Sequence, residues 1–439
     1  MGISNQNAWL NNIVDFIGEY VRTNPGYSPR DLKESLKRHF FVSTEGAEKL
    51  AGLVEMELSG SKLGLAAIEL NLTFNCNLTC EYCFIHNKRP NDRMSLATAK
   101  NVIDLLMERA AYPVVNVTLI GGEPLLEFNL IKQIVPYTLE AAKKRNLGIT
   151  WSVTTNGILI NEEILKFFAI HKINLMLSMD GGPETHDRYR RTKSGEGTWH
   201  KIASLIPLIK TYQPWIGVRM TVSTEAVGSM REDFKQLVGM GINQFIIAPA
   251  QGEKCWNKDQ IEQYGINLVK ILRDYHELKR RGVPIFIEEF EKGENEYWGW
   301  GCRAGSTSLA VAPNGDVSPC SKLLGLTEED GKYIVGNVNS GINIKLLEPF
   351  RNPVSRQPHH CKPCSRKCTG GCYAVNFEQT GDHFTASEEN CLFWVVCQET
   401  KRISKMMALD CDRGRLRQER TVPCRTPSES DQQKIPGFL

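Results

Sequence analysis

Three closely spaced cysteines constrain this chain more than any other feature of its sequence. They follow the pattern Cys76-x3-Cys80-x2-Cys83 and come just after Ala66–Thr73, an apolar run typical of a β-strand. Thiolates at this spacing can hold three corners of a four-iron cluster and leave the fourth iron without a protein ligand. Because structural iron–sulfur and zinc sites normally use four protein ligands, the vacancy predicts chemistry at the metal. A zinc site or a redox-active group of cysteines is the alternative explanation.

The bulk properties of the chain exclude several classes of protein. Its 439 residues allow two or three domains, and a net charge of only +3 predicts neither a nucleic-acid partner nor an acidic one. No apolar run is long enough to cross a membrane, and Met1–Tyr20 lacks the basic and apolar regions of a signal peptide. We therefore expect a cytoplasmic protein, whose 14 cysteines are read as metal ligands before disulfides.

Strands and amphipathic helices alternate over residues 63–282. Helices are expected, for example, over Ser95–Ala111 and Asn161–His171. Repeated strand–helix units in this order predict a parallel sheet whose strands all end at the same mouth. The six expected strands are Ala66–Thr73, Val114–Ile120, Ile149–Thr155, Ile173–Ser178, Ile216–Val222 and Gln244–Pro249.

Residues 1–62 form a separate helical region in this interpretation. Apolar residues recur at helical spacing over Asn7–Arg22, a second helix starts after Ser28-Pro29, and a third is expected over Ser43–Leu58. These helices could dock a peptide or cap the sheet. A winged-helix peptide-binding domain would need a β-hairpin, which this region does not indicate.

The C-terminal part of the chain has a different composition. Residues 283–398 are richer in glycine, proline and cysteine and lose the helical periodicity, although a last helix is expected over Leu392–Leu409. Residues 399–439 would hold the end of this helix and a tail. From Cys411 onward the tail has little apolar content, so we expect it to be largely disordered.

The cysteine triplet, with the aromatic Tyr82 directly before its third member, resembles the signature of the radical S-adenosylmethionine (radical SAM) superfamily. The resemblance implies an α/β fold with a partial (β/α)6 barrel, which the six strand–helix units match. It also implies that Cys76, Cys80 and Cys83 hold a four-iron cluster whose open iron binds SAM. An electron from the reduced cluster would then cleave SAM to methionine and a 5′-deoxyadenosyl radical.

Polar segments at the ends of the following strands match the SAM-binding segments of this superfamily. The second strand ends in Gly121-Gly122-Glu123-Pro124, where two residues without side chains allow a ligand to approach the backbone closely. The resemblance assigns this segment to the SAM amino group. The other residues expected at the cofactor are Tyr82, Asn156, Ser178, Asp180 and Arg219.

Each of these polar residues also has a purely structural explanation. Turn capping by Asn156, Ser178 or Asp180 is as well supported as ligand contact. The segment His186–Arg190 resembles the HDxxR sequence of the superfamily, and a salt bridge at a helix start is favoured over contact with SAM. Arg219 points either into the barrel or outward, and a buried arginine would need an anion such as the SAM carboxylate.

A second system of seven cysteines lies in the C-terminal region. Its order, with Gly315 between the first two cysteines, resembles the SPASM domain of radical SAM peptide and protein maturases. The resemblance implies two auxiliary four-iron clusters, for three [4Fe–4S] clusters in total. A zinc site remains the alternative for the middle of the run, whose spacings suit zinc too. The first auxiliary cluster would use Cys302, Cys320 and Cys372, and the second Cys361, Cys364, Cys368 and Cys391.

Three departures from the SPASM pattern bear on function. Three residues separate Cys364 from Cys368, where sulfatase-maturing members have five. No cysteine lies shortly before Cys302, so the first auxiliary cluster would have an open iron or a distant fourth ligand, for which Cys255 is the candidate. The residue after Cys320 is Ser321, where sulfatase maturases have an aspartate base. Serine cannot be that base unaided, which argues against sulfatase maturation.

These resemblances imply an oxidoreductase that modifies a ribosomally synthesised peptide or a protein side chain. Hydrogen abstraction would be followed by closure of a thioether or carbon–carbon cross-link, with ferredoxin or flavodoxin as the electron carrier. No nucleic acid or membrane is expected as a partner. Maturation of a protein cofactor or of a sulfatase-type residue is the enzymatic alternative. A non-catalytic iron–sulfur or zinc protein, acting as a sensor or scaffold, is the alternative from another class.

Overall fold

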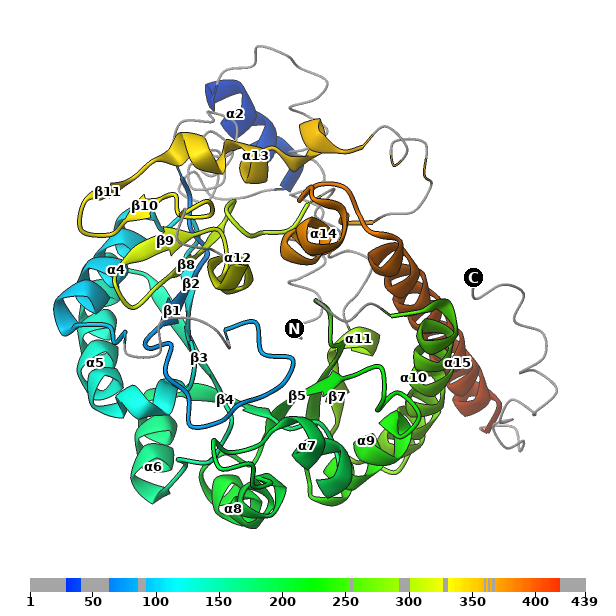
Figure 1. The fold of residues 1–439 in the computed structure, drawn as a ribbon. Helices are drawn as coiled ribbons and strands as arrows, with labels where there is room; N and C mark the ends of the chain where they lie inside the picture. The colour runs from blue at the N-terminus through cyan, green and yellow to red at the C-terminus, as the bar shows by residue number, and fades with distance from the viewer. Residues whose placement is uncertain are drawn as a thin grey trace.

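The structure is a computed structural model of the chain, shown in Figure 1. It describes residues 29–40, 63–85, 92–252, 256–291, 301–326, 331–358, 361, 364 and 368–418. Four predictions therefore lie outside the described residues: the helices expected over 7–22 and 43–58, the position of Cys255, and the disorder expected in the tail beyond residue 418. The second N-terminal helix is present as α2 (Pro29–Phe40).

One large sheet organises the described residues. Its strand order is β11-β10-β9-β8-β1-β2-β3-β4-β5-β6-β7, parallel from β8 to β7 and antiparallel from β8 to β11. The α/β fold with a parallel sheet and all six predicted strands are confirmed. The strands are β1 (Ala67–Asn71), β2 (Val114–Ile120), β3 (Gly148–Thr155), β4 (Ile173–Ser178), β5 (Gly217–Val222), β6 (Gln244–Pro249), β7 (Phe286–Ile287), β8 (Ser308–Val311), β9 (Asp316–Ser318), β10 (Gly336–Asn337) and β11 (Gly341–Ile342).

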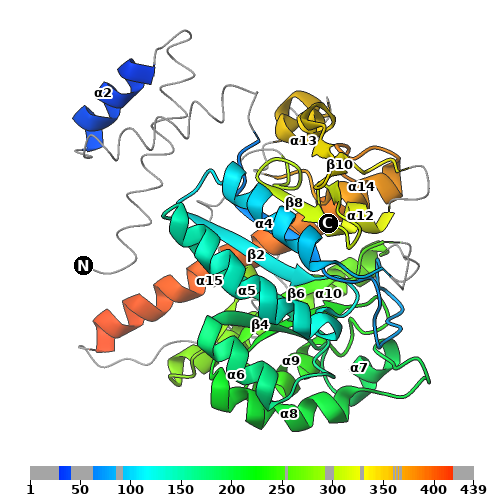
Figure 2. The same cartoon turned by 90° about the vertical axis from the view of Figure 1, so that its left-hand side faces the viewer.

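Helices cover the outer face of the curved sheet, and its inner face lies toward the centre of the ring (Figure 1). Figure 2 shows α4, α5, α6 and α8 in sequence along the outside. The outer helices are α4 (Leu96–Arg109), α5 (Phe128–Lys144), α6 (Glu162–His171), α8 (Trp199–Tyr212), α9 (Met230–Gly239) and α10 (Lys258–Arg280). The shorter and C-terminal elements are η1 (Pro124–Glu127), α7 (Pro183–Tyr189), α11 (Glu288–Glu291), α12 (Ser321–Leu326), η3 (Ile344–Leu347), α13 (Glu348–Arg351), η4 (Pro353–Arg356), α14 (Tyr373–Thr380) and α15 (Glu388–Gln418).

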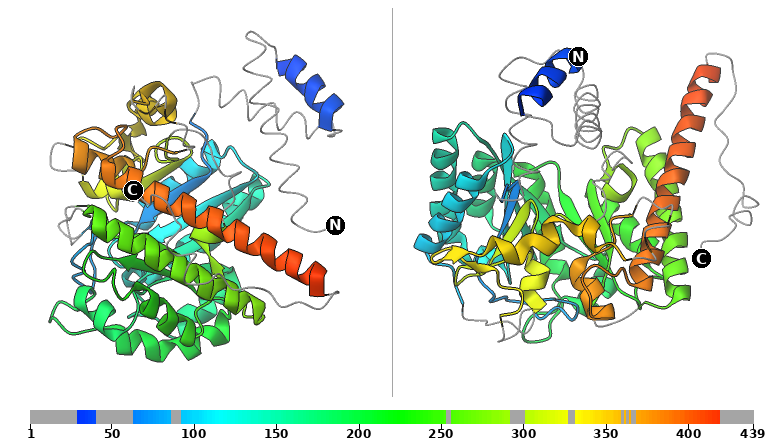
Figure 3. Two further views of the ribbon diagram at one scale, coloured as in Figure 1. Left: turned by 90° about the vertical axis from the view of Figure 1, so that its right-hand side faces the viewer. Right: turned by 90° about the horizontal axis from the view of Figure 1, so that it is seen from above.

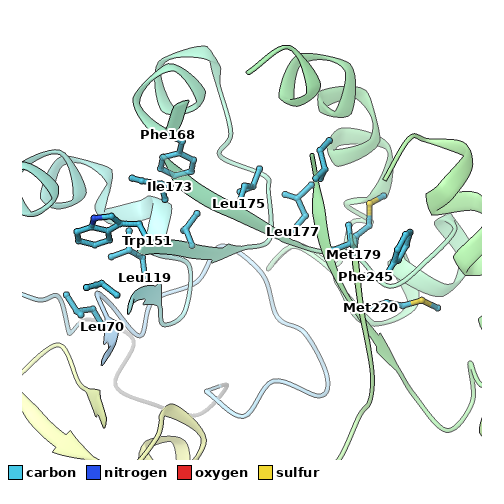
Figure 4. Packing of buried hydrophobic residues seen from close by; sticks show 14 of the residues in the cluster. Leu70, Leu119, Trp151, Phe168, Ile173, Leu175, Leu177, Met179, Met220 and Phe245 are labelled. Atoms are coloured by element: carbon cyan, nitrogen blue, oxygen red, sulfur yellow. The ribbon is translucent and has the colours of Figure 1, made fainter. Parts of the chain in front are cut away.

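The hydrophobic core lies between the sheet and these helices. Side chains alternate along each strand, so Leu70, Leu119 and Leu177 are buried against the helices while their neighbours face the other side. Figure 4 shows this layer, with Trp151 of β3 and Phe168 of α6 among its side chains. Each such fully buried side chain contributes about 1.5–3 kcal/mol of apolar burial. Polar side chains such as those of Glu69, Thr118 and Ser178 lie on the concave face.

The C-terminal region extends the barrel sheet across the boundary that we predict after residue 282. Beyond it, β7 pairs with β6, and β8 pairs in parallel with β1. The last helix, α15, packs along α10 (Figure 3). Phe393 of α15 makes edge-on contacts with Trp256 and Tyr264. The helix expected over Leu392–Leu409 is longer than predicted, because α15 continues to Gln418 and includes the first residues of the expected tail. No helix in the described part is long and apolar enough to cross a membrane.

Candidate functional site

The cysteine triplet lies on the loop that follows β1, at the carboxyl end of that strand. All three thiols are free and partly buried. The Leu78 N–H donates to Cys76 Sγ over 3.4 Å, and Cys83 N–H bonds the carbonyl of Cys80 over 3.1 Å. Burial raises the pKa of Cys76 to about 12 and that of Cys80 to about 11. The thiols are therefore protonated in the absence of a cation, and metal binding would release their protons.

The twin glycines at the end of β2 bring that strand against the cysteine loop. Gly121 has a φ of +134°, and a Cβ there would collide with the Thr73 carbonyl oxygen; a Cβ on Gly122 would collide with that of Asn75. The Gly122 and Glu123 N–H groups bond these same two carbonyls over 2.8 and 2.9 Å. Backbone-to-backbone contact thus explains the glycines, whereas the sequence analysis attributed them to ligand approach.

Glu123 joins the ends of β2 and β3. Its carboxylate, which is buried, accepts from Thr155 Oγ1 at 2.7 Å and from the Asn156 N–H at 2.9 Å. Burial raises the pKa of Glu123 to about 7 despite these hydrogen bonds. Asn156 in turn donates to Asn77 Oδ1 at 2.7 Å, beside Cys76. The predicted pair Glu123 and Asn156 therefore positions the cysteine loop.

Asp180 and Arg190 form a buried ion pair beneath the same loop. The guanidinium Nε and Nη2 donate to the two carboxylate oxygens at 2.8 and 3.0 Å. The Tyr82 hydroxyl and the Thr221 N–H donate to the same carboxylate. Burial would raise the pKa of Asp180, but the Arg190 charge outweighs it and holds that pKa below its usual range. Both carboxylate oxygens are occupied, so Asp180 orients Tyr82 and hence the loop between Cys80 and Cys83.

The His186–Arg190 segment does form a salt bridge, but through Arg190, which lies just after the end of α7 and not at a helix start. The Asp180 N–H donates to His186 Nδ1 over 3.4 Å, and Nε2 lies 3.0 Å from Thr198 Oγ1. Since Thr198 Oγ1 donates to the Arg190 carbonyl, His186 is the donor in the second bond. Burial lowers the pKa of His186 to about 4, so its ring is neutral at pH 7.

Ser178 and Arg219 lie next to each other on the concave face, in register on β4 and β5. Arg219 is exposed, whereas its neighbours Val218 and Met220 are buried against the helices. The choice left open by the sequence is thus settled: Arg219 faces the inside of the barrel. No ion pair forms with it within the part of the chain that the structure describes. Its positive charge is available to an anionic group.

Cys302, Cys320 and Cys372 come together in a small second core. Cys320 and Cys372 pack against its buried residues, and the Tyr373 hydroxyl accepts the Cys302 N–H at 2.9 Å. Burial raises the pKa of Cys302 and of Cys320, and the nearby charge of Cys372 raises both pKa values further. The first predicted cysteine set is therefore a spatial group.

The second predicted set is also a spatial group. Burial raises the pKa of Cys361, with further contributions from Cys391, Cys368 and Cys364. The Cys364 N–H bonds the Cys361 carbonyl over 3.2 Å, and Cys368 Sγ accepts from the Gly370 N–H at 3.2 Å. Cys391 reaches the set from α15. Ligation of this set would join that helix to the loop before α14.

Sequence reasoning missed one residue of this region, Glu69. It lies in the middle of β1, on the concave face, and its Oε2 accepts both the N–H and the hydroxyl of Ser321, at 3.0 and 2.6 Å. Asn71, also on β1, donates to the Ser321 hydroxyl oxygen at 3.0 Å. An acidic side chain is thus present beside Ser321 after all. Ser321 by itself no longer argues against chemistry that needs a carboxylate at this position.

Comparison with known proteins identifies the family. Residues 70–222 match the family model described as the radical SAM superfamily, and residues 302–369 match an iron–sulfur cluster-binding domain named SPASM. An uncharacterised protein of Methanocaldococcus jannaschii is 30% identical over 64% of this chain and 92% of its own length. The chain belongs to the radical SAM superfamily. It is thus a radical SAM enzyme with a SPASM domain, from a family that uses iron–sulfur clusters and SAM.

Relatives of this radical SAM enzyme include maturases. A serine-type anaerobic sulfatase-maturating enzyme of Klebsiella aerogenes is 25% identical over 68% of this chain and 77% of its own length. The antilisterial bacteriocin subtilosin biosynthesis protein AlbA of Bacillus subtilis is 23% identical over 76% of this chain and 72% of its own.

Solved structures share the fold. The anSMEcpe structure with bound AdoMet and Cp18Cys peptide has a TM-score of 0.63 at 20% identity and covers 78% of this chain and 99% of its own. Streptococcus suis SuiB bound to precursor peptide SuiA has a TM-score of 0.55 at 17% identity, over 81% and 82% of the two chains.

Proposed function

We propose that this radical SAM/SPASM enzyme installs a thioether or carbon–carbon cross-link in a ribosomally synthesised peptide. The observation that carries the proposal is the junction between β8 and β1, which brings the SPASM cysteines to the edge of the SAM barrel. The chain therefore has two further groups of cysteines besides the triplet in the barrel. Relatives named for bacteriocin biosynthesis and for a precursor-peptide complex support the peptide substrate.

Each group of site residues would have a separate role in this function. Cys76, Cys80 and Cys83 would hold the first cluster, and this cluster together with SAM would supply the radical that removes a substrate hydrogen atom. Gly121-Gly122-Glu123-Pro124 and Asn156 fix the cysteine loop, and Asp180 with Arg190 fixes Tyr82. Arg219, with Ser178 beside it, offers the SAM carboxylate a cation.

Two auxiliary clusters complete the proposal, held by Cys302, Cys320 and Cys372 and by Cys361, Cys364, Cys368 and Cys391. They would pass the electron left by substrate oxidation to a ferredoxin- or flavodoxin-type carrier. Residues 63–282 would act as the SAM barrel and 283–398 as the auxiliary domain. Residues 1–62 would hold the peptide or cap the barrel, and 399–439 would complete the C-terminal helix and tail.

Maturation of a sulfatase-type residue is the second candidate, and Glu69 favours it. Its carboxylate lies within hydrogen-bonding distance of Ser321. A carboxylate at this place could accept a proton from a substrate side chain. The sequence-based argument against this candidate rested on the absence of such a group.

Product analysis separates the two candidates. Anaerobically reconstituted enzyme, SAM and dithionite would be incubated with short cysteine-rich peptides, and in parallel with a cysteine-containing sulfatase peptide. The proposal predicts 5′-deoxyadenosine and a cysteine-rich peptide that has lost two hydrogen atoms. Trapping of an aldehyde by a hydrazide in the sulfatase peptide alone would establish the second candidate instead. The protein should also bind about twelve irons, four for each cluster.

A further inference from the structure

The two auxiliary cysteine groups differ in size. The larger group has four cysteines, Cys361, Cys364, Cys368 and Cys391, whereas the smaller group has three among the described residues, Cys302, Cys320 and Cys372. A four-iron cluster has four iron corners. The smaller group therefore leaves one corner for a ligand that is not among its cysteines.

Glu69 is the acidic side chain next to the smaller group. It lies on β1 between Thr118 of β2 and Ala310 of β8. The chain continues from β8 through the β9 hairpin, which ends two residues before Cys320. The N–H group of Ser321, the residue directly after Cys320, donates to Glu69 at 3.0 Å. The carboxylate thus lies beside the backbone that carries one of the three thiols.

The orientation of Glu69 is fixed on one side only. Oε2 accepts the Ser321 N–H and hydroxyl, and that hydroxyl oxygen accepts from Asn71 Nδ2. Ser321 and Asn71 are themselves buried. In the described part of the chain, Oε1 has no hydrogen-bond donor and no Lys or Arg pairs with the carboxylate. Metal-binding carboxylates are typically held in this way, with one oxygen hydrogen-bonded and the other left for the metal.

We propose that Glu69 is the fourth ligand of the first auxiliary cluster and binds iron through Oε1. The inference rests on the proposed function only in so far as Cys302, Cys320 and Cys372 hold a cluster. Iron would also neutralise the concentration of negative charge that three thiolates and a carboxylate create. The alternative is that Glu69 only fixes the start of α12, at Ser321, to the barrel.

The test is a direct spectroscopic search for the carboxylate on the cluster. Full-length protein would be produced with glutamate labelled with carbon-13 at the side-chain carboxyl, reconstituted anaerobically and reduced. Saturating SAM would occupy the open iron of the barrel cluster. Electron–nuclear double resonance on the auxiliary signal should show a carbon-13 coupling. The coupling should be lost in Glu69→Gln, because a neutral amide keeps the shape of the side chain but binds iron poorly.

Two further variants serve as controls. Ser321→Ala removes a hydrogen bond to Glu69 without removing the carboxylate, so the coupling should persist with an altered size. Cys255→Ala should leave the auxiliary signal unchanged. Persistence of the same coupling in Glu69→Gln, its absence from the wild type, or collapse of the signal in Cys255→Ala would each overturn the proposal.

The wild-type label decides the question even if Glu69→Gln does not fold. The result also separates this inference from the proposed function. If the wild-type protein shows auxiliary signals but no carbon-13 coupling, only the assignment of Glu69 as a ligand is contradicted. A wild-type protein with about four irons and no auxiliary signal contradicts both.

Discussion

The barrel cysteines and the C-terminal cysteines are held by different means. The barrel loop is fixed by protein contacts: Gly122 bonds Thr73, and Tyr82 is held by the buried pair of Asp180 and Arg190. The C-terminal cysteines come from a β-hairpin end, a loop and α15, elements far apart in the sequence. The barrel is thus prepared for its cluster before the metal arrives, whereas the C-terminal region gains a connection between its parts when the metal binds.

The largest expected effect is loss of the barrel cluster. Replacing Cys76, Cys80 and Cys83 together by Ala should abolish reductive SAM cleavage, because these thiols would hold the cluster that supplies the electron. About four of about twelve irons should disappear, and the auxiliary signals should remain. The measurement is 5′-deoxyadenosine formation with iron analysis. Continued 5′-deoxyadenosine formation would show that SAM cleavage does not depend on the barrel cysteines.

Removing the second auxiliary set should have a more selective effect. Cys361→Ala with Cys364→Ala should stop peptide modification but leave most SAM cleavage, since the barrel loop makes its own contacts. Chromatography of 5′-deoxyadenosine and mass spectrometry of the peptide measure the two activities separately. Equal loss of both would mean that the barrel depends on the C-terminal clusters.

Asp180→Asn tests how far the barrel is prepared by protein contacts. It leaves the Arg190 charge buried without its partner and should reduce the free energy of unfolding by about 3–5 kcal/mol. The matched control is Asp274→Asn, which breaks the partly exposed pair with Arg231 and should cost less than about 1 kcal/mol. Urea unfolding of the two apoproteins gives the comparison. Similar losses of unfolding free energy would show that the buried pair of Asp180 and Arg190 does not stabilise the barrel more than a partly exposed pair does.

The sequence predicted one region better than the other for physical reasons. The six barrel strands were evident because alternating apolar runs are local patterns. Glu69 was missed because its meaning depends on Ser321, which approaches it only when β8 pairs with β1. The twin glycines were assigned correctly to a close approach, but the approaching group is the backbone of Thr73 and Asn75, which no local pattern shows.

The smallest predicted effect is a pH dependence in the barrel. The pKa of His186 is lowered from 6.5 to about 4 by burial, so the unfolded chain binds more protons between these values. The stability contributed by neutral His186 is therefore complete above pH 6.5 and is lost as the pH falls toward 4. At pH 5 the loss relative to pH 7 should be about 2 kcal/mol.

The comparison with His186→Gln isolates this contribution. The variant should be less stable than the wild type at pH 7, and the difference should shrink by about 2 kcal/mol at pH 5. Glu123, whose raised pKa of about 7 produces the opposite slope, is present in both proteins and cancels. A difference that does not depend on pH would mean that His186 is not held neutral.

Hydrogen–deuterium exchange tests the contrast between the two regions most directly. Apoprotein and anaerobically reconstituted protein would be compared peptide by peptide. The account predicts that reconstitution increases protection mainly in peptides from 301–326 and 368–391, while the strands β1 to β6 are equally protected in both states. Equal protection of the C-terminal peptides with and without metal, or loss of protection in the barrel strands of the apoprotein, would contradict it.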